Sequence, residues 1–273
     1  MKILIAADME GITGVVCWDH VSPDHTEYPR YRRLMTGDVN AAIRGTLEGG
    51  ADEVVVTDGH AYGRNLLIEE LDPRAKLNSG SSSPLSMVQG IDQGVDGVIF
   101  VGYHARIGAQ NAILEHTWSS ERVSNLWINQ QPFGETGLNA AVSGHFGVPV
   151  LMVTGDQTVC AEASALLGPV ETVVVKVASG RTSAECLPPS VSQEKIQAGA
   201  EKAIRNLIVG LAPKPLVVPP PITLAIDFTN SDMADRAALL PGSHREGRRL
   251  EYTTQDMLTI FTAFRSALAL ARG

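Results

Sequence analysis

The segment MKILIAADME, residues 1–10, places a short apolar strand directly before two carboxylates. Residues 3–7 are continuously apolar, which is typical of a strand buried in a parallel sheet. Ligands of such sheets bind outside the carboxyl ends of the strands, and Asp8 and Glu10 follow at that end. Two carboxylates this close repel each other unless a proton or a cation lies between them. The segment therefore predicts a buried parallel strand with a cation site at its end.

Further along the chain, apolar strands alternate with helical segments. Strands are expected at 53–57, 97–102, 149–154 and 171–177, and helices at 31–49, 65–71, 135–146 and 158–167. A strand pair is also expected within residues 113–128. This alternation predicts an α/β fold, with a doubly wound, mostly parallel sheet and helices on both of its faces.

The pattern changes after about residue 186. The segment 212–221 contains five prolines and is expected to be an extended connector. Around it, helices are expected at 192–209, 232–240 and 254–271, and strands at 222–228 and 249–253. We therefore expect two domains, a metal-binding α/β catalytic domain at 1–190 and a smaller C-terminal α+β domain at 191–273.

Composition excludes several classes of protein. The 273 residues are 44% hydrophobic and carry a formal net charge of -8, which argues against a nucleic-acid-binding surface. No apolar run approaches the roughly 20 residues that cross a bilayer. Lys2 is followed by only five apolar residues before Asp8, unlike a signal peptide. The three cysteines show no CxxC spacing. We expect a cytoplasmic protein without membrane contact.

Two histidines repeat the arrangement of Asp8 and Glu10. His60 and His104 each follow a predicted apolar strand, so they are expected at the same edge of the sheet. Carboxylates together with imidazoles suit zinc, and also manganese or cobalt. From spacing alone, a shared metal site and ordinary loop histidines both stay open. Asp58 could orient the His60 imidazole, and Asp156, which follows another strand, could line the site.

Six motifs in order are more specific than this spacing. They are DMEGITG at 8–14, TDGH at 57–60, GYHAR at 102–106, FGETGLNA at 133–140, PVLMVTGD at 149–156 and QDML at 255–258. On these motifs the chain resembles the zinc-dependent D-aminopeptidases of the DppA type, peptidase family M55, also called dipeptide transport proteins. The resemblance extends over essentially the whole chain.

The resemblance implies a set of site residues. Two zinc ions are expected to be bound, with Asp8 as the natural bridge, by Asp8, Glu10, His60, His104 and Glu135. Glu135 comes from the resemblance alone, because its position before a predicted helix would otherwise suit a carboxylate stabilised by the helix dipole. The resemblance also assigns a catalytic role to His116, as general base, general acid or oxyanion stabiliser.

The implied activity is hydrolysis of the N-terminal peptide or amide bond of short peptides, with a preference for D-amino acids such as D-Ala. The family also implies a homo-oligomer, such as a decameric ring. Two alternatives stay open. One is a different metallo-amidohydrolase of small amides, and the other is a non-catalytic component for peptide binding or transport.

Overall fold

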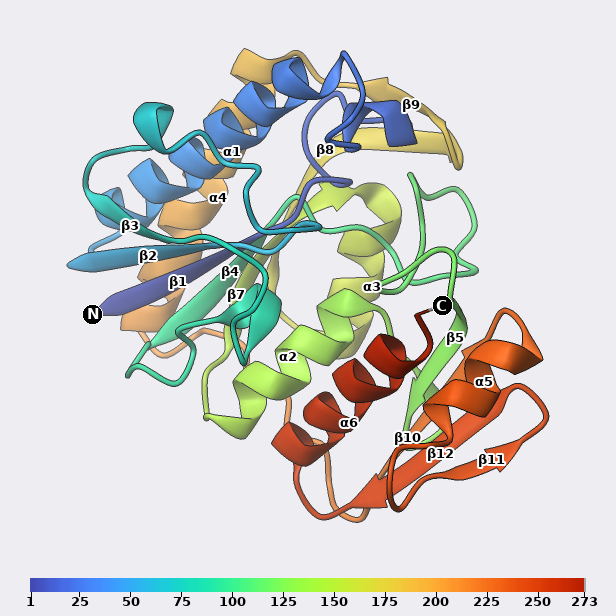
Figure 1. Cartoon of the computed structure of the whole chain (residues 1–273). Coiled ribbons are helices and arrows are strands. Elements are labelled where there is room, and N and C mark those ends of the chain that lie inside the picture. The colour runs from blue at the N-terminus through green and yellow to red at the C-terminus, as the bar shows by residue number, and fades with distance from the viewer. Residues whose placement is uncertain (273) are drawn as a thin grey trace.

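A seven-stranded sheet forms the centre of the protein in the computed structural model, which describes residues 1–272 (Figure 1). Its strand order is β3-β2-β1-β4-β7-β8-β9, and only β9 runs antiparallel to its neighbour. The strands are β1 (Lys2–Ala7), β2 (Glu53–Asp58), β3 (Ala75–Asn78), β4 (Gly97–Val101), β7 (Val150–Asp156), β8 (Glu171–Gly180) and β9 (Ser183–Cys186). The predicted α/β fold with a doubly wound, mostly parallel sheet is confirmed.

Helices cover both faces of this sheet (Figure 1). They are α1 (Tyr28–Glu48) and α4 (Pro189–Ile208) on one face, and α2 (Glu135–His145) and α3 (Gln157–Leu167) on the other. Ile3 and Ile5 of β1 pack in the core beneath α1 and α4, whereas Leu4 and Ala6 pack in the core of the opposite face. This alternation explains why β1 is apolar from residue 3 to residue 7, since both of its faces are buried there.

A second, antiparallel sheet lies beside α6, with strand order β11-β12-β10-β5-β6 (Figure 1). Its elements are β5 (Val123–Ile128), β6 (Gln131–Pro132), β10 (Ile222–Phe228), β11 (His244–Glu246) and β12 (Arg249–Thr254), with the helices α5 (Ser231–Ala237) and α6 (Met257–Leu270). The two sheets do not divide at residue 190, because β5 and β6 belong to the second sheet and α4 packs against α1. A domain boundary at 190 stays a prediction.

Of the strand pair expected within residues 113–128, the second strand forms and the first does not. Only β5 forms there, and it pairs with β10 and β6. The preceding residues form a loop in which Leu114 and Trp118 have φ angles of 49° and 63°, a left-handed conformation that interrupts the extended backbone of a strand. Further differences concern short elements, namely the 3-10 turns η1 (Trp18–His20), η2 (Ile68–Glu70, in place of the expected helix at 65–71) and η3 (Ser86–Val88).

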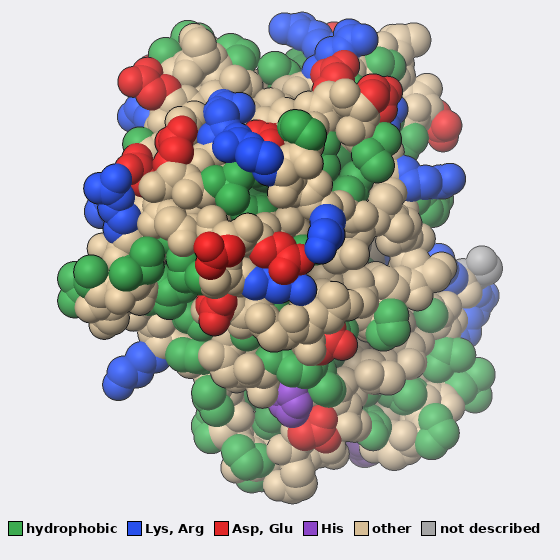
Figure 2. All heavy atoms as spheres, turned by 90° about the vertical axis from the view of Figure 1, so that its left-hand side faces the viewer, with side chains coloured by type: hydrophobic (Ala, Val, Ile, Leu, Met, Phe, Trp, Pro, Cys, Tyr) green, Lys and Arg blue, Asp and Glu red, His purple; other side chains and the backbone are tan. Residues whose placement is uncertain are grey.

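The surface shows mixed charge on the face that Figure 2 presents, where Lys and Arg side chains lie among Asp and Glu. Several of the chain's exposed charges form ion pairs at the β2–β3 edge, such as Lys76 with Glu53 at 2.9 Å. Within residues 1–272, no helix combines the length and the apolar composition that a membrane crossing requires. The cytoplasmic location stays a prediction.

Candidate metal centre

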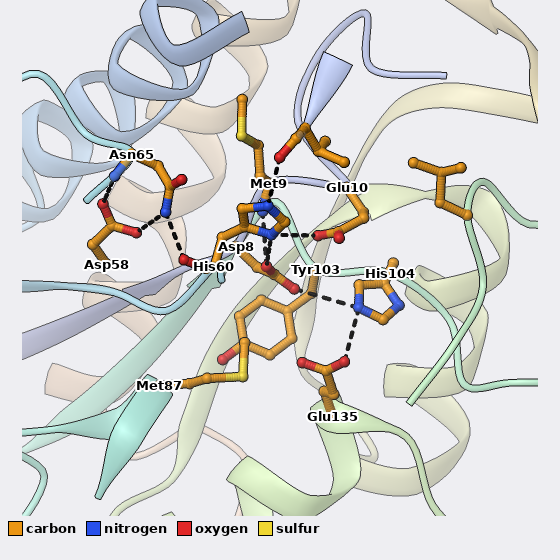
Figure 3. A network of polar contacts seen from close by, with 12 residues as sticks. Asp8, Met9, Glu10, Asp58, His60, Asn65, Met87, Tyr103, His104 and Glu135 are labelled. Atoms are coloured by element: carbon orange, nitrogen blue, oxygen red, sulfur yellow. Dashed lines mark hydrogen bonds and ion pairs between the residues drawn. The ribbon is translucent and has the colours of Figure 1, made fainter. Parts of the chain in front are cut away.

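Three neighbouring parallel strands end at the site. β1 lies between β2 and β4 with Ala7 paired to Asp58 and to Val101, so the residues after these strands emerge at one edge of the sheet. Gly11 lets the chain turn there, because a Cβ atom at this position would lie 1.9 Å from the Tyr103 carbonyl oxygen. The structure thereby brings together Asp8, Glu10, His60 and His104 (Figure 3).

His60 faces both of the first two carboxylates. Its Nδ1 lies 3.3 Å from Asp8 Oδ1 and 3.1 Å from Glu10 Oε2. Its Nε2 lies 3.0 Å from the carbonyl oxygen of Val21, and because a carbonyl only accepts, Nε2 carries the hydrogen. The backbone therefore fixes the tautomer that leaves the Nδ1 lone pair directed toward Asp8 and Glu10.

His104 repeats this arrangement from β4. Its Nδ1 donates to the Ala105 carbonyl oxygen at 3.0 Å, and its Nε2 lies 3.4 Å from Asp8 Oδ2 and 3.1 Å from Glu135 Oε1. Asp8 therefore offers one oxygen atom beside His60 and the other beside His104 (Figure 3).

Glu135 reaches the cluster from the first position of α2. The amide of Trp118 donates to its Oε1 at 2.7 Å, and the partial positive charge of the helix N-terminus further stabilises the carboxylate. This residue follows no strand of the sheet, which is why strand-end reasoning did not reach it. The structure places Glu135 in the cluster, 3.1 Å from His104 Nε2, and its role as a metal ligand stays a prediction.

His116 lies in the loop that precedes β5 and stacks on His104, with ring centroids 4.1 Å apart. Its Nδ1 donates to the Leu114 carbonyl oxygen at 2.8 Å. Its Nε2 is 3.6 Å from Glu135 Oε1 and 4.0 Å from Glu10 Oε1. Because this carbonyl only accepts, Nδ1 carries the hydrogen, and the lone pair of Nε2 is directed toward the carboxylates. His116 is therefore placed to exchange a proton or to bind a cation.

Burial and mutual charge shift the pKa values of the cluster. Burial, and then the charge of Glu10, raises the pKa of Asp8 to about 7. Burial alone would lower the pKa of His104, but the charge and hydrogen bond of Glu135, together with the charges of Asp8 and Glu10, outweigh it and raise the pKa to about 10. Burial and the neighbouring His104 lower the pKa of His116. Without a cation, the cluster thus takes up protons to balance its carboxylates.

The donor atoms fit a metal. Two sets of ligand atoms each lie within 4.8 Å of one another, one from Asp8, Glu10 and His104 and one from His104, His116 and Glu135. Asp8 Oδ2 and His104 Nε2 are buried, and among residues 1–272 they make the ion-pair contacts given above but no hydrogen bond. Buried polar atoms of this kind are costly unless a ligand satisfies them. Carboxylate oxygen together with imidazole nitrogen is a donor set that suits zinc.

Two supporting aspartates differ from expectation. Asp58 does not contact the His60 imidazole; its Oδ1 accepts from the Asn65 side chain at 2.7 Å and its Oδ2 accepts from the Leu66 amide at 2.8 Å. Asn65 in turn donates to the His60 carbonyl oxygen at 2.7 Å, so Asp58 holds the loop and not the ring. Asp156 caps α3 and accepts from the Ile113 amide at 2.7 Å, which fixes the start of the His116 loop.

Lys176 is a supporting residue that sequence reasoning missed. It is 1% exposed, and its Nζ donates to the carbonyl oxygens of Glu10, Ile12 and Val15 at 2.6, 2.9 and 2.7 Å. These bonds fix the backbone that carries Glu10. A signal was present, because a lysine in the otherwise apolar run of residues 173–177 is unusual for a buried strand.

A cavity of about 590 Å³ opens beside the cluster. Asp8, Glu10, His60, His116 and Glu135 line one part of it. The other walls come from residues 61–63 and 80–83 and from residues 118–122 with the end of α6. A volume of this size is typical of sites for small ligands. The cluster can therefore act on a small molecule held in the cavity.

Comparisons with known proteins find similar proteins over nearly the whole chain. The family model described as D-aminopeptidase, peptidase family M55, matches residues 1–266. The D-aminopeptidase of Bacillus subtilis strain 168 is 36% identical over 265 residues, which are 96% of this chain and 95% of that protein. A solved structure, "Zn-dependent D-aminopeptidase DppA from Bacillus subtilis, a self-compartmentalizing protease", superposes with a TM-score of 0.95 at 36% identity, covering 99% of this chain and 98% of the other.

Proposed function

Since the chain belongs to the M55 family of D-aminopeptidases, we propose that it is a zinc-dependent aminopeptidase that hydrolyses the N-terminal peptide or amide bond of short peptides. The observation that carries the proposal is the buried cluster at the strand ends, with Asp8 Oδ2 and His104 Nε2 lacking hydrogen-bond partners within residues 1–272. A free α-amino group suits an acidic site of this kind, because a carboxylate can hold it as an ammonium.

Two zinc ions are proposed, with Asp8 shared between them. Its two oxygens point to different imidazoles, which supports one site with Glu10 and His60 and another with His104 and Glu135. Zinc, when bound, supplies a Lewis acid for the scissile carbonyl and lowers the pKa of water from 15.7 toward ~7. The carbonyls of Val21 and Ala105 hold the imidazoles in the tautomers that this binding needs.

His116 is proposed as the general base. Its Nδ1–H is engaged by the Leu114 carbonyl, so its Nε2 accepts the proton of the attacking water and then returns it to the leaving amine nitrogen. Burial and His104 lower its pKa, which favours the neutral ring that a base requires. Trp18 packs edge-on against this ring, with the two ring centroids 5.4 Å apart, and limits its rotation.

The preference for D-amino acids and the assembly are proposed from the relatives. The Bacillus subtilis protein is called a D-aminopeptidase, and its structure is described as self-compartmentalizing. We extend both properties to this chain, as a D-Ala preference and as a homo-oligomer such as a decameric ring. An assembly that encloses the cavities would restrict access to short peptides.

The experiment that tests the proposal combines metal analysis with hydrolysis of paired substrates. We expect about two zinc per chain, and faster cleavage of D-Ala amide and D-Ala dipeptides than of their L-Ala counterparts. Removing zinc with a chelator should stop turnover, and returning zinc should restore it.

Each other outcome has a distinct meaning. About two metal ions per chain together with faster cleavage of the L-Ala substrates would support the metal site and reject the proposed preference for D-Ala. Metal without turnover of any amide, but with peptide binding, would favour a peptide-binding protein. Absence of both metal and turnover after zinc is supplied would reject the proposal altogether.

A further inference from the structure

Three arginines line the same cavity as the candidate metal ligands. Arg122 lies just before β5, Arg265 lies on α6, and Arg272 follows the end of that helix. Figure 1 shows the end of α6 beside the start of β5, where these segments meet. The second sheet and its helix thus contribute cations to a cavity whose floor is acidic.

None of these arginines forms an ion pair with a carboxylate within residues 1–272, in contrast to most other arginines of the chain. Arg249 pairs with Asp227 at 2.7 Å and Arg181 with Glu115 at 3.0 Å. Arg122 Nε is buried and has no hydrogen-bond partner in the described part of the chain. In a chain with net charge -8, carboxylates are abundant, so this lack of partners is notable.

The environment of Arg122 favours an anion. Burial, and then the positive charge of Arg272, lowers the pKa of Arg122, while the charge of the neighbouring Glu121 opposes this shift without forming an ion pair with Arg122 among residues 1–272. A half-buried guanidinium beside another cation is unfavourable unless an anion offsets it. Arg265 is anchored differently, because its Nη1 donates to the Ser83 carbonyl oxygen at 2.9 Å. It therefore ties α6 to the opposite wall and adds positive charge there.

We propose that Arg122, supported by Arg265 and Arg272, binds the C-terminal carboxylate of the peptide substrate. The inference rests on the proposed aminopeptidase function and adds the substrate class, free di- and tripeptides. Arg122 is six residues beyond His116, so their Cα atoms are at most roughly 20 Å apart. A guanidinium pairs with a carboxylate through two parallel hydrogen bonds, which fixes the position of the peptide end.

The geometry implies how substrates are ranked. A peptide with its amine at the candidate metal ligands and its carboxylate at Arg122 contacts both groups of cavity-lining residues. A substrate that lacks the carboxylate contacts only one of them, so it should bind more weakly.

The test compares D-Ala-Gly with D-Ala-Gly amide on the zinc-loaded protein. We expect the unmodified protein to cleave the free dipeptide with a kcat/KM about 10-fold or more above that of the amide, the effect of one charged hydrogen-bonded pair. Arg122→Gln should remove this advantage through KM, with kcat within about 2-fold. D-Ala-Glu amide, which carries a side-chain carboxylate, distinguishes a terminal from a side-chain anion.

Matched variants separate charge from folding. Arg122→Lys keeps the charge without the planar fork and should restore part of the advantage. Arg33→Gln alters an arginine that lies outside the cavity lining, whose Nε is 3.5 Å from Glu70, and should leave both substrates unchanged. Equal cleavage of dipeptide and amide by the unmodified protein, or equal losses on both in Arg122→Gln, would overturn the proposal.

Calorimetric binding of D-Ala-Gly distinguishes this inference from the proposed function. Binding that depends on Arg122, without turnover, would reject the aminopeptidase and keep the carboxylate site. Turnover that is indifferent to Arg122 would keep the aminopeptidase and reject the carboxylate site.

Discussion

Two groups of buried charge involve residues 8–15, and they differ in how well the chain satisfies them. In the candidate metal centre, Asp8 Oδ2 and His104 Nε2 have no hydrogen-bond partner among the described residues. Lys176, in contrast, donates to three backbone carbonyls within 2.9 Å. A buried charge that the chain satisfies itself stabilises the fold, whereas one left unsatisfied is available to a ligand.

The largest expected effect is on the candidate metal centre, whose buried atoms lack hydrogen-bond partners. His104→Ala should lower kcat/KM roughly 1000-fold or more, since losing a metal ligand removes several kcal/mol of transition-state stabilisation. It should also lower the zinc content, while circular dichroism stays unchanged because the apolar core is intact. His116→Ala should lose activity but retain its zinc, because His116 is proposed as a base and not as a ligand.

His145→Ala is the matched control for both variants, because this histidine is exposed at the end of α2. Metal analysis and kinetics on the three variants would check the distinction. Loss of zinc in His116→Ala would identify His116 as a ligand, and activity retained in His104→Ala would contradict the proposed site.

The next largest effect is expected at Lys176, whose charge the backbone carbonyls satisfy. Lys176→Met should leave the Glu10, Ile12 and Val15 carbonyls buried without their donor, and lower the free energy of unfolding by at least about 3 kcal/mol. Because Glu10 then loses its backbone support, zinc affinity should fall about 10–100-fold. Urea unfolding and zinc titration measure the two effects.

Lys202→Met serves as the control for this variant, since Lys202 is 64% exposed and pairs with Glu171 at the surface. A Lys176→Met protein with unchanged zinc affinity would show that the loop holds Glu10 without the lysine.

The sequence allowed the sheet and most of the cluster to be predicted, because both follow from local patterns. Apolar strands such as β1 and β4 are buried on both faces, and the residues after them must emerge at one edge. Asp8 and His104 were therefore placed from periodicity. Glu135 needed the family resemblance, because no strand precedes it.

What could not be predicted depends on contacts between distant segments. The His116 loop follows backbone conformations at Leu114 and Trp118 that tertiary contacts impose, and the apolar pattern around it resembled a strand. β5 joins the second sheet through β10, about a hundred residues later in the chain. The role of Lys176 depends on carbonyls more than 160 residues away.

A smaller effect concerns pH. Burial raises the pKa of Asp38 to about 6, and the Thr13 amide, which donates to its Oδ2 at 3.0 Å, opposes this shift. The folded state therefore binds more protons than the unfolded state between about pH 4 and 6, so this group's contribution to stability falls as pH rises. The Asp38→Asn protein has no carboxyl group to ionise at this position, so it does not lose stability in this way. Its free energy of unfolding, relative to that of the unmodified protein, should therefore rise by up to about 3 kcal/mol from pH 4 to pH 7.

Urea unfolding of both proteins in chelator measures this difference, because titration of the metal cluster then cancels between them. A constant difference across the pH range would show that Asp38 stays ionised in the folded protein.

The smallest effect is expected for a charge that is neither buried nor unsatisfied. Arg181 pairs with Glu115, beside His116, with its Nε 3.0 Å from Glu115 Oε1. The side chain of Arg181 is 46% exposed, so solvent screens the pair and Arg181→Gln should cost less than about 1 kcal/mol of stability. The amide of Leu114 donates to the Arg181 carbonyl oxygen, a bond that the substitution leaves in place, so kcat should change less than in His116→Ala. A loss of activity as large as that of His116→Ala would mean that exposed charge also positions the base, and the contrast between buried and exposed charges would fail.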